Sequence, residues 1–487
     1  MRIDISTVPS FVPSASSLHV QVVTLPFDRA STDLEASSPA AARLAAEARR
    51  LGFTGEIGES VVAQGSGDGE AAWYALVGAG ASPRATAYRR VGAAVVRLAR
   101  QYKVEDAHVC GAISGERARF LAEGCHLTGY RFDRYLTSAK GTEKGLKAVR
   151  IQGDAFAAVV QTGLNTAESI CFARDLANEH PGVCNPTWLA EKATELAARY
   201  GMDLKIRDEH ALEAEGFGLI MAVGKGSASP PRLIHLTYRS PEAERTVIAL
   251  VGKGITYDSG GYSLKPPASQ LNMHLDMGGA AAVLGAAEAV GRLKPAGVEV
   301  HFIVPAAENM VSGAAVKLNE VMKSYSGQTV EMQNTDAEGR LVLGDALWYA
   351  TRLEPDYVID LATLTGACVV ALGEDTAGVF TPDDAFAGKF LEAAAAVDEN
   401  MWRLPLSERS VSSIKSDVAD MKNIGGKWGG AITAAHFLRR FVGETAWLHV
   451  DIAGPAMTEA EWEYINKGGT GFGVATLAEF IQRAGRQ

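Results

Sequence analysis

Four near-continuous apolar runs constrain the fold of this chain more than any other feature. They are residues 246–251, 298–304, 357–361 and 446–452. Ala- and Leu-rich stretches with helical spacing, such as residues 278–293 and 339–353, lie between them. Strands that are apolar along their whole length are typical of a parallel sheet with helices on both faces. The sequence therefore predicts an α/β fold with a mainly parallel sheet, and functional groups beyond the carboxyl ends of its strands.

The first third of the chain predicts a separate, smaller α/β domain. Apolar β-like runs at residues 18–26, 72–77, 107–113 and 148–152 are interleaved with helical patterns such as residues 87–101. A chain of 487 residues is also too long for one ordinary hydrophobic core. We expect the boundary near residue 160, which gives an N-terminal domain over 1–160 and a second domain over 161–487.

Composition excludes several classes of partner. The formal net charge of −10 argues against generic binding to nucleic acid or to an anionic membrane surface. No stretch approaches the roughly 18 apolar residues of a membrane helix, and the N-terminus has no apolar signal-peptide core. The five cysteines are scattered and lack a CxxC spacing, which indicates reduced thiols. These features predict a cytoplasmic location.

Charged side chains gather in three segments that follow the apolar runs: GKGITYDSGGYSLKPP, MHLDMGGAAA and QNTDAEGRLVLGDAL. They supply Lys253, Asp258 and Lys265, then Asp276, and finally Asp336, Glu338 and Arg340. A lone Asp more often caps a helix or forms a surface ion pair, but a cap does not use two carboxylates and a guanidinium together. Hard divalent cations prefer several carboxylate oxygens, and two neighbouring cations need a carboxylate that bridges them. No HExxH motif is present, so a zinc site built from histidines is disfavoured.

The segment NTDAEGRL resembles the signature of the leucyl aminopeptidase family, which includes cytosol aminopeptidases and bacterial aminopeptidase A and peptidase B-like members. The segments VGKGITYDSGG, DMGGAAAV, PAAENMVSG, DLATLTGA and HVDIAG resemble that family in the same order. The resemblance covers most of the chain and is strongest from about Ala173 onward. It implies a macro-like N-terminal domain, a catalytic domain that binds two metal ions, and a homohexamer.

The resemblance also implies roles for the metal-binding residues. Asp258 and Glu338 would be shared between two divalent ions, Mn²⁺ or Zn²⁺. Asp336 would complete the site of the first ion, and Lys253 and Asp276 that of the second. A lysine can bind a metal only as the neutral amine, so the cation and burial must lower the pKa of Lys253.

For catalysis, the resemblance implies that Lys265 polarises the scissile carbonyl and that Arg340 holds a bicarbonate. The bicarbonate would act as the general base toward a water or hydroxide that bridges the metals. The pocket for the first side chain of the peptide would be lined by Met273, Thr363, Gly366 and Ala456 and would suit leucine-like residues. The chain would then remove N-terminal residues from peptides.

Alternatives to this function remain at the level of sequence. A dipeptidase or Cys-Gly hydrolase could use the same site, because pocket shape and assembly decide the substrate. A DNA-binding regulatory protein on this scaffold is disfavoured by the acidic balance of the chain. A catalytically silent relative would have lost a ligand, whereas every matched ligand is intact.

Overall fold

The computed structural model describes residues 3–10, 16–24, 39–65, 71–81, 84–137 and 146–486. The chain forms two compact units, one of Met1–Cys171 with Ala460–Asn466 and one of Phe172–Glu459 with Lys467–Gln487. Residue 160 lies inside helix α5 (Ala157–Ala177), so the domain limits 1–160 and 161–487 stay a prediction. Within the described ranges, no helix combines the length and apolar composition needed to cross a membrane.

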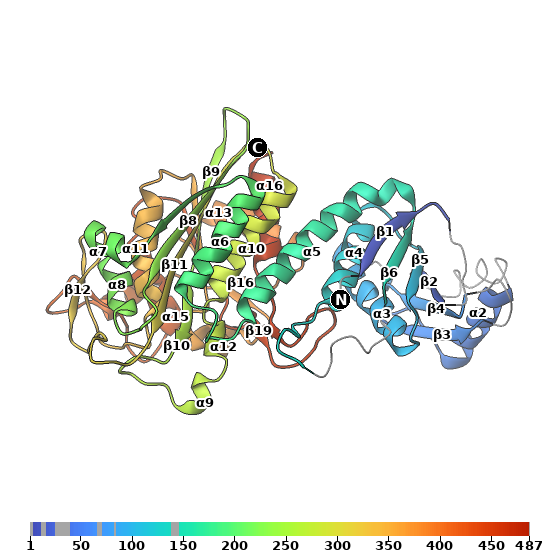
Figure 1. Cartoon of the computed structure of the whole chain (residues 1–487), viewed down its shortest axis with the longest axis horizontal. Helices are drawn as coiled ribbons and strands as arrows, with labels where there is room; N and C mark the ends of the chain where they lie inside the picture. Colours follow the sequence, from blue (N-terminus) through green and yellow to red (C-terminus); the bar gives the residue numbers. More distant parts are fainter. Residues whose placement is uncertain are drawn as a thin grey trace. The chain divides into compact units, whose positions relative to one another are not determined.

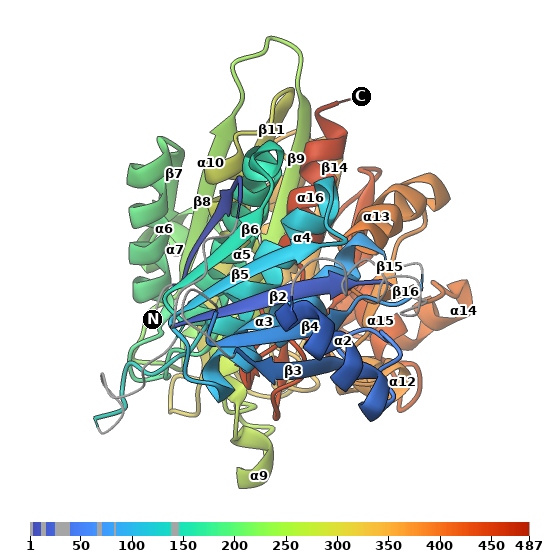
Figure 2. The same ribbon diagram turned by 90° about the vertical axis from the view of Figure 1, so that its right-hand side faces the viewer.

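Unit 1 contains a six-stranded sheet in the order β1-β6-β5-β2-β4-β3. The strands are β1 (Asp4–Val8), β2 (Ser17–Val23), β3 (Ser60–Gln64), β4 (Trp73–Gly78), β5 (Asp106–Gly111) and β6 (Ala148–Gln152). All neighbouring pairs are parallel except β3 with β4, and Figure 2 shows the strands side by side. The four runs expected from the sequence became β2, β4, β5 and β6, although residues 25 and 26 of the first lie outside the described residues.

The two strands that the sequence pattern missed, β1 and β3, are the edges of this sheet. Each has only one fully buried residue in five, so neither presents a long apolar run. Helices α3 (Tyr88–Gln101) and α4 (Gly115–Gly129) pack against each other, and α3 also contacts β2, β4 and β5. Their buried side chains form one core with the strands.

Unit 2 is built on a nine-stranded sheet whose central strands are parallel. Its order is β16-β15-β18-β14-β9-β11-β8-β7, and β10 also pairs with β11. The four expected runs are the central strands β9 (Thr246–Gly252), β11 (Val298–Asn309), β14 (Tyr357–Ala362) and β18 (Trp447–Asp451). Their mutual pairings are parallel, which confirms the predicted fold class.

Antiparallel pairing occurs toward both edges of this sheet. Strands β7 (Asp203–Arg207) and β8 (Arg232–Arg239) continue it antiparallel on the β11 side. On the other side β15 (Ala377–Phe380) runs antiparallel to β18 and parallel to β16 (Met401–Arg403). The short strand β10 (Gly254–Asp258) pairs in parallel with the carboxyl-terminal part of β11.

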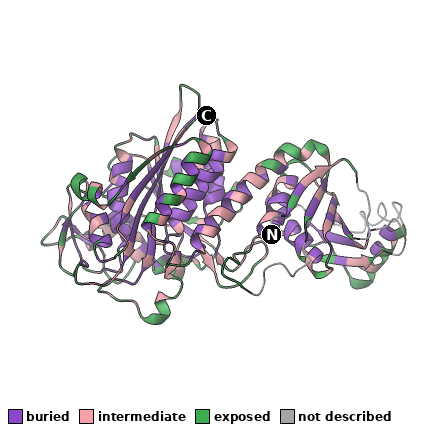
Figure 3. Ribbon diagram, in the orientation of Figure 1, coloured by how far each residue is buried: buried purple, intermediate pink, exposed green. Residues whose placement is uncertain are grey.

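Helices cover both faces of the sheet, as Figure 1 shows, and the strands between them are buried along most of their length (Figure 3). One layer contains α6 (Pro186–Tyr200), α10 (Gly278–Leu293), α13 (Asp384–Ala396) and α16 (Val474–Ala484). The other contains α8 (Gly218–Gly224), α11 (Gly339–Thr351) and α15 (Gly430–Arg439). Helix α6 begins after Asn185, whose side chain accepts a hydrogen bond from the Trp188 amide at 2.9 Å, and Pro186 occupies its first position.

Candidate metal centre and active site

The three charged segments meet at the carboxyl ends of the central strands of the unit 2 sheet. Lys253 lies between β9 and β10, and Asp258 is the last residue of β10. Asp276 precedes α10, while Asp336 and Glu338 precede α11. The carboxyl ends of β9 and β14 and the N-terminus of α10 are tied together there, since the Lys253 amide donates to Leu361 O and the Ala280 amide donates to Lys253 O.

The side chain of Lys253 is almost completely buried among acidic groups. Its Nζ lies 2.8 Å from Asp276 Oδ1 and 3.0 Å from Glu338 Oε1, and it donates to Thr363 O at 2.9 Å. Gly339 makes this path possible, because a Cβ there would lie 2.6 Å from Lys253 Nζ. The sequence AEGR therefore combines a carboxylate ligand with the space that Lys253 needs.

Lys265 is the centre of a second charged group. Its Nζ lies 2.9 Å from Asp258 Oδ2 and 2.6 Å from Asp336 Oδ1. The turn that returns Lys265 to this position requires Gly260, which has φ +87° and whose added Cβ would lie 2.9 Å from Asp336 Oδ1. Asn309 fixes the other oxygen of Asp258 by donating to Oδ1 at 2.8 Å.

Three buried carboxylates lie close enough together to share a cation. One oxygen each of Asp258, Asp276 and Glu338 lies within 4.8 Å of the others. Asp276 Oδ2 and Glu338 Oε2 are buried and have no hydrogen-bond partner among the described residues. Glu338 stands at the N-terminus of α11 but makes no capping bond with its side chain. Unmatched hard oxygen atoms at this spacing fit a divalent metal ion, because one lysine is shared by two of these buried carboxylates, Asp276 and Glu338, and a buried polar atom without a partner is costly.

The electrostatics of the cluster agree with this interpretation. Burial raises the pKa of Asp258 and raises that of Asp276 well above its usual range, with the neighbouring carboxylates adding to both rises. Burial opposes the charge on Lys253, yet Asp276, Glu338 and Asp258 outweigh it and raise the pKa of the lysine. The protein alone therefore keeps Lys253 protonated, and the expected neutral amine requires the charge of a bound cation.

Arg340 is buried in the first turn of α11. Its Nη1 donates to Asn423 O at 2.9 Å, while its Nε has no hydrogen-bond partner in the described part of the chain. Burial lowers the pKa of Arg340 to about 10, against Glu338 and Asp451, which raise it. The guanidinium thus stays charged at neutral pH and offers an unmatched donor, as an anion site requires.

The four residues expected to line the pocket for the first side chain come from three segments. Thr363 and Gly366 follow β14, Ala456 follows β18, and Met273 begins a short 3-10 helix, Met273–Leu275, just before Asp276. A Cβ built on Gly278 would lie 3.2 Å from Thr363 Cγ2 and 3.3 Å from Ala456 Cβ, so these two residues face the same small space. A Cβ on Gly366 would meet no atom within 4 Å, which leaves room beside it.

Comparison with known proteins shows the family of this chain. The model of the cytosol aminopeptidase family, catalytic domain, matches residues 171–478, and that of the N-terminal domain matches residues 25–139. The chain belongs to the cytosol aminopeptidase family. It is a metal-dependent aminopeptidase, as its motifs predicted.

Relatives of this aminopeptidase span most of its length. A probable cytosol aminopeptidase of Aquifex aeolicus is 46% identical over 403 residues, which cover 81% of each chain. Leucine aminopeptidase 1 of Arabidopsis thaliana is 43% identical over 448 residues, covering 88% of this chain and 85% of its own.

Solved structures of similar enzymes agree in fold. The bottromycin maturation enzyme BotP in complex with Mn has a TM-score of 0.86 and 36% identity, covering 97% of this chain and 100% of its own. A mutant of tomato leucine aminopeptidase has a TM-score of 0.87 and 35% identity, covering 99% and 97%.

Sequence reasoning missed three residues that support the site of this aminopeptidase. Asn309 positions Asp258, Asn423 O accepts a hydrogen bond from Arg340, and Asp451 binds the loop that carries Thr363. Asn309 and Asp451 are the last residues of their strands, in the segments PAAENM and HVDIAG. Their place at the carboxyl ends of buried strands was the available signal.

Proposed function

We propose that this aminopeptidase hydrolyses peptides with two divalent cations held by five residues, and that it prefers leucine-like first residues. Asp258 and Glu338 would be shared by both ions, Asp336 would serve the first, and Lys253 and Asp276 would serve the second. The observation that carries the proposal is the group of three buried carboxylates within 4.8 Å, two of which have an oxygen without a hydrogen-bond partner among the described residues. The Mn complex of BotP supports Mn²⁺ as one of the ions to test.

When bound, two such cations lower the pKa of a water molecule and polarise the carbonyl that it attacks. Lys265 places a positive charge beside Asp258 and Asp336, where it would donate to the carbonyl oxygen of the substrate. Arg340 would hold a bicarbonate through its unmatched donor and so keep a general base near the site.

A panel of aminoacyl amides, assayed with Mn²⁺ and with Zn²⁺ and paired with metal analysis, tests this function. We expect two ions per chain at full activity, the highest kcat/KM on leucine-like amides, and no cleavage of the same amides when their N-terminus is blocked. Full activity after complete removal of metal would contradict the proposal. A preference for dipeptides or for Cys-Gly within the same panel would reassign the substrate and keep the metal centre.

We further propose a cytoplasmic homohexamer. The name cytosol aminopeptidase, shared by relatives such as that of Aquifex aeolicus, supports the location, and the family resemblance supports the assembly. Sedimentation at micromolar concentration tests the assembly. A species with the mass of one chain of 51.5 kDa would contradict it.

A further inference from the structure

Asp451 is a fully buried carboxylate at the carboxyl end of β18, and its oxygens bind two different loops. Oδ1 accepts from the amides of Leu364 at 3.2 Å and Thr365 at 3.4 Å, in the loop after β14. The same oxygen accepts from the amide of Ala453 at 3.1 Å, in the loop after β18. Oδ2 accepts from Thr365 Oγ1 at 2.6 Å. Asp451 therefore joins these two loops to the end of one strand.

Both loops carry residues assigned to the pocket for the first side chain. The first loop contains Thr363 and leads into Gly366 at the start of α12 (Gly366–Leu372), and the second leads to Ala456. Thr363 also contacts the metal centre, because its carbonyl accepts from Lys253 Nζ and its hydroxyl donates to Asp276 Oδ1 at 2.7 Å. By binding the first loop, Asp451 thus affects the position of the pocket residues and of Thr363, which contacts two of the proposed ligands.

The chemistry of the contact requires a carboxylate. An ionised Asp only accepts, and both oxygens of Asp451 are used: Oδ1 accepts from three amides and Oδ2 from one hydroxyl. An Asn side chain has one acceptor oxygen and one NH2 donor group, so either the three amides or the Thr365 hydroxyl would face a donor in place of an acceptor. Thr365 adds a further link, because its hydroxyl oxygen also accepts from the Cys368 amide at 3.0 Å and so begins α12.

We propose that Asp451 is a positioning residue that sets the shape of the pocket for the first side chain and its placement against the second metal's ligands. The inference rests on the proposed function of that pocket. The side-chain hydrogen bonds of Asp451 go to the two loops and to none of the proposed metal ligands. Its loss should therefore change which substrate is preferred more than it changes how many metal ions are bound.

The matched control is Asp360, a second fully buried carboxylate on the neighbouring strand β14. Asp360 accepts from Trp447 Nε1 at 2.7 Å and pairs with His449 Nδ1 at 2.6 Å, and no hydrogen bond links it to either loop. Asp451→Asn and Asp360→Asn thus remove the same charge from adjacent strands. Only the first change disturbs the loops that carry the pocket.

For Asp451→Asn we expect the ratio of kcat/KM on leucine amide to that on alanine amide to fall about tenfold, the scale of discrimination by one methylene in a pocket. Hydrogen–deuterium exchange should rise in residues 363–366 and 452–456, and metal stoichiometry should stay as in the wild type. Asp360→Asn should leave the ratio and the exchange of both loops unchanged. An unchanged ratio in folded Asp451→Asn, or an equal fall in Asp360→Asn, would overturn the proposal.

A second pair of variants keeps the test valid if Asp451→Asn does not fold. Thr365→Val removes the hydroxyl that binds Asp451 with little change in volume, while Thr365→Ser retains it. We expect the leucine-to-alanine ratio to fall in Thr365→Val and to be restored in Thr365→Ser, and equal ratios in both would overturn the proposal. Failure of the proposed function is distinguishable, because the wild-type protein itself would then show no preference between the two amides.

Discussion

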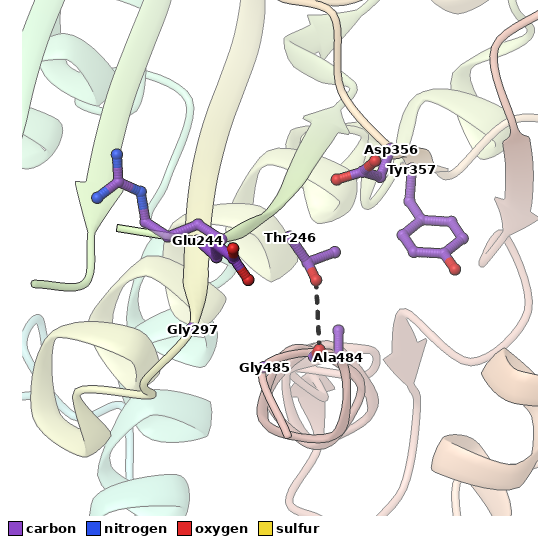
Figure 4. A pocket seen from close by; sticks show the side chains of 8 residues that line it. Glu244, Thr246, Gly297, Asp356, Tyr357, Ala484 and Gly485 are labelled. Atoms are coloured by element: carbon purple, nitrogen blue, oxygen red, sulfur yellow. Dashed lines mark hydrogen bonds between the residues drawn. The ribbon is translucent and has the colours of Figure 1, made fainter. Parts of the chain in front are cut away.

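The two ends of the central strands in unit 2 offer different kinds of site. At their amino ends, residues before and within β9 and β14 line an open cavity of about 480 Å³ with the end of α16 (Figure 4). Its polar groups include ones with ordinary partners: the Val247 amide donates to Asp356 Oδ2 at 2.8 Å, and Thr246 Oγ1 donates to Ala484 O at 3.4 Å. At the carboxyl ends, the charged cluster contains two buried carboxylate oxygens without hydrogen-bond partners in the described part of the chain.

The difference shows that unmatched buried charge marks this active site better than open volume does. The N-termini of α10 and α11 begin at the carboxyl edge, where their positive ends favour carboxylates and anions. The C-terminal end of α16, at Ala484, lies at the other edge and offers carbonyl oxygens to the cavity. Among the described residues, the proposed metal-binding and anion-binding groups therefore lie at the carboxyl ends of the central strands.

The largest expected effect comes from Glu338→Ala. Losing this carboxylate removes an oxygen that both ions would share, so metal content and turnover should fall to background together. Metal analysis alongside kcat on leucine amide measures both. Two bound ions in an inactive Glu338→Ala protein would contradict the role of a shared ligand.

Lys265→Ala should separate catalysis from metal binding. Its ammonium faces Asp258 and Asp336, and losing the hydrogen bond that it is proposed to donate to the substrate oxygen should reduce kcat by roughly 10²–10³ while both ions stay bound. Lys265→Arg, which keeps the charge, is the matched control and should retain more activity. Normal turnover in Lys265→Ala with metals intact would show that another group polarises the carbonyl.

Arg340→Ala should have a smaller effect, about tenfold in kcat, because water or buffer ions can partly replace a displaced bicarbonate as general base. Both metals should remain bound, and adding bicarbonate should raise the rate of the wild type but not that of the variant. Equal stimulation of the two proteins would place the anion elsewhere.

The fold could be predicted from sequence where strands are continuous apolar runs. The site could be predicted where one short segment contains several charged residues. Central strands such as β9 read as continuous apolar runs, whereas the edge strands β1 and β3 do not, because each is mostly exposed or half-buried. Asp336, Glu338 and Arg340 could be predicted as site residues because three charged side chains fall within five positions of the sequence. The place of Asp451 at the end of a buried strand marks it as a candidate, but its role depends on amides of residues 86 and 87 positions earlier in the chain, and no local pattern encodes those contacts.

Two buried histidines on β8 and β11 hydrogen-bond each other and predict how stability depends on pH. His235 Nε2 lies 3.0 Å from His301 Nδ1, and His235 Nδ1 lies 2.8 Å from the hydroxyl of Tyr349. Burial lowers the pKa of His235 to about 3, helped by His301, and lowers that of His301 to about 4. Since both side chains are neutral in the fold and titrate near 6.5 when unfolded, their contribution is complete above about pH 6.5 and is lost as the pH falls toward 4.

Denaturant unfolding of the wild type and of His301→Gln at pH 7 and pH 4.5 measures this contribution. The variant lacks one of the two titrating groups, so its free energy of unfolding should fall less between the two values than that of the wild type. Parallel losses in both proteins would assign the acid sensitivity to other groups, such as the carboxylates of the metal centre.

The smallest effect is expected from a substitution in the cavity at the amino ends of the strands. This substitution tests whether the two ends of the strands differ in function. Asp356→Asn keeps an acceptor for the Val247 amide, so stability should change by no more than about 1 kcal/mol, the net worth of one hydrogen bond. Because no proposed ligand or catalytic group lies among the residues that line this cavity, kcat/KM should stay within about twofold of the wild type, as for surface changes away from a site. Asp258→Asn is the matched change at the other edge, and it should abolish activity because Asp258 would be shared by both ions. A loss of turnover in Asp356→Asn that approaches the loss in Asp258→Asn would show that this cavity takes part in the reaction, and the distinction between open volume and unmatched charge would then fail for this enzyme.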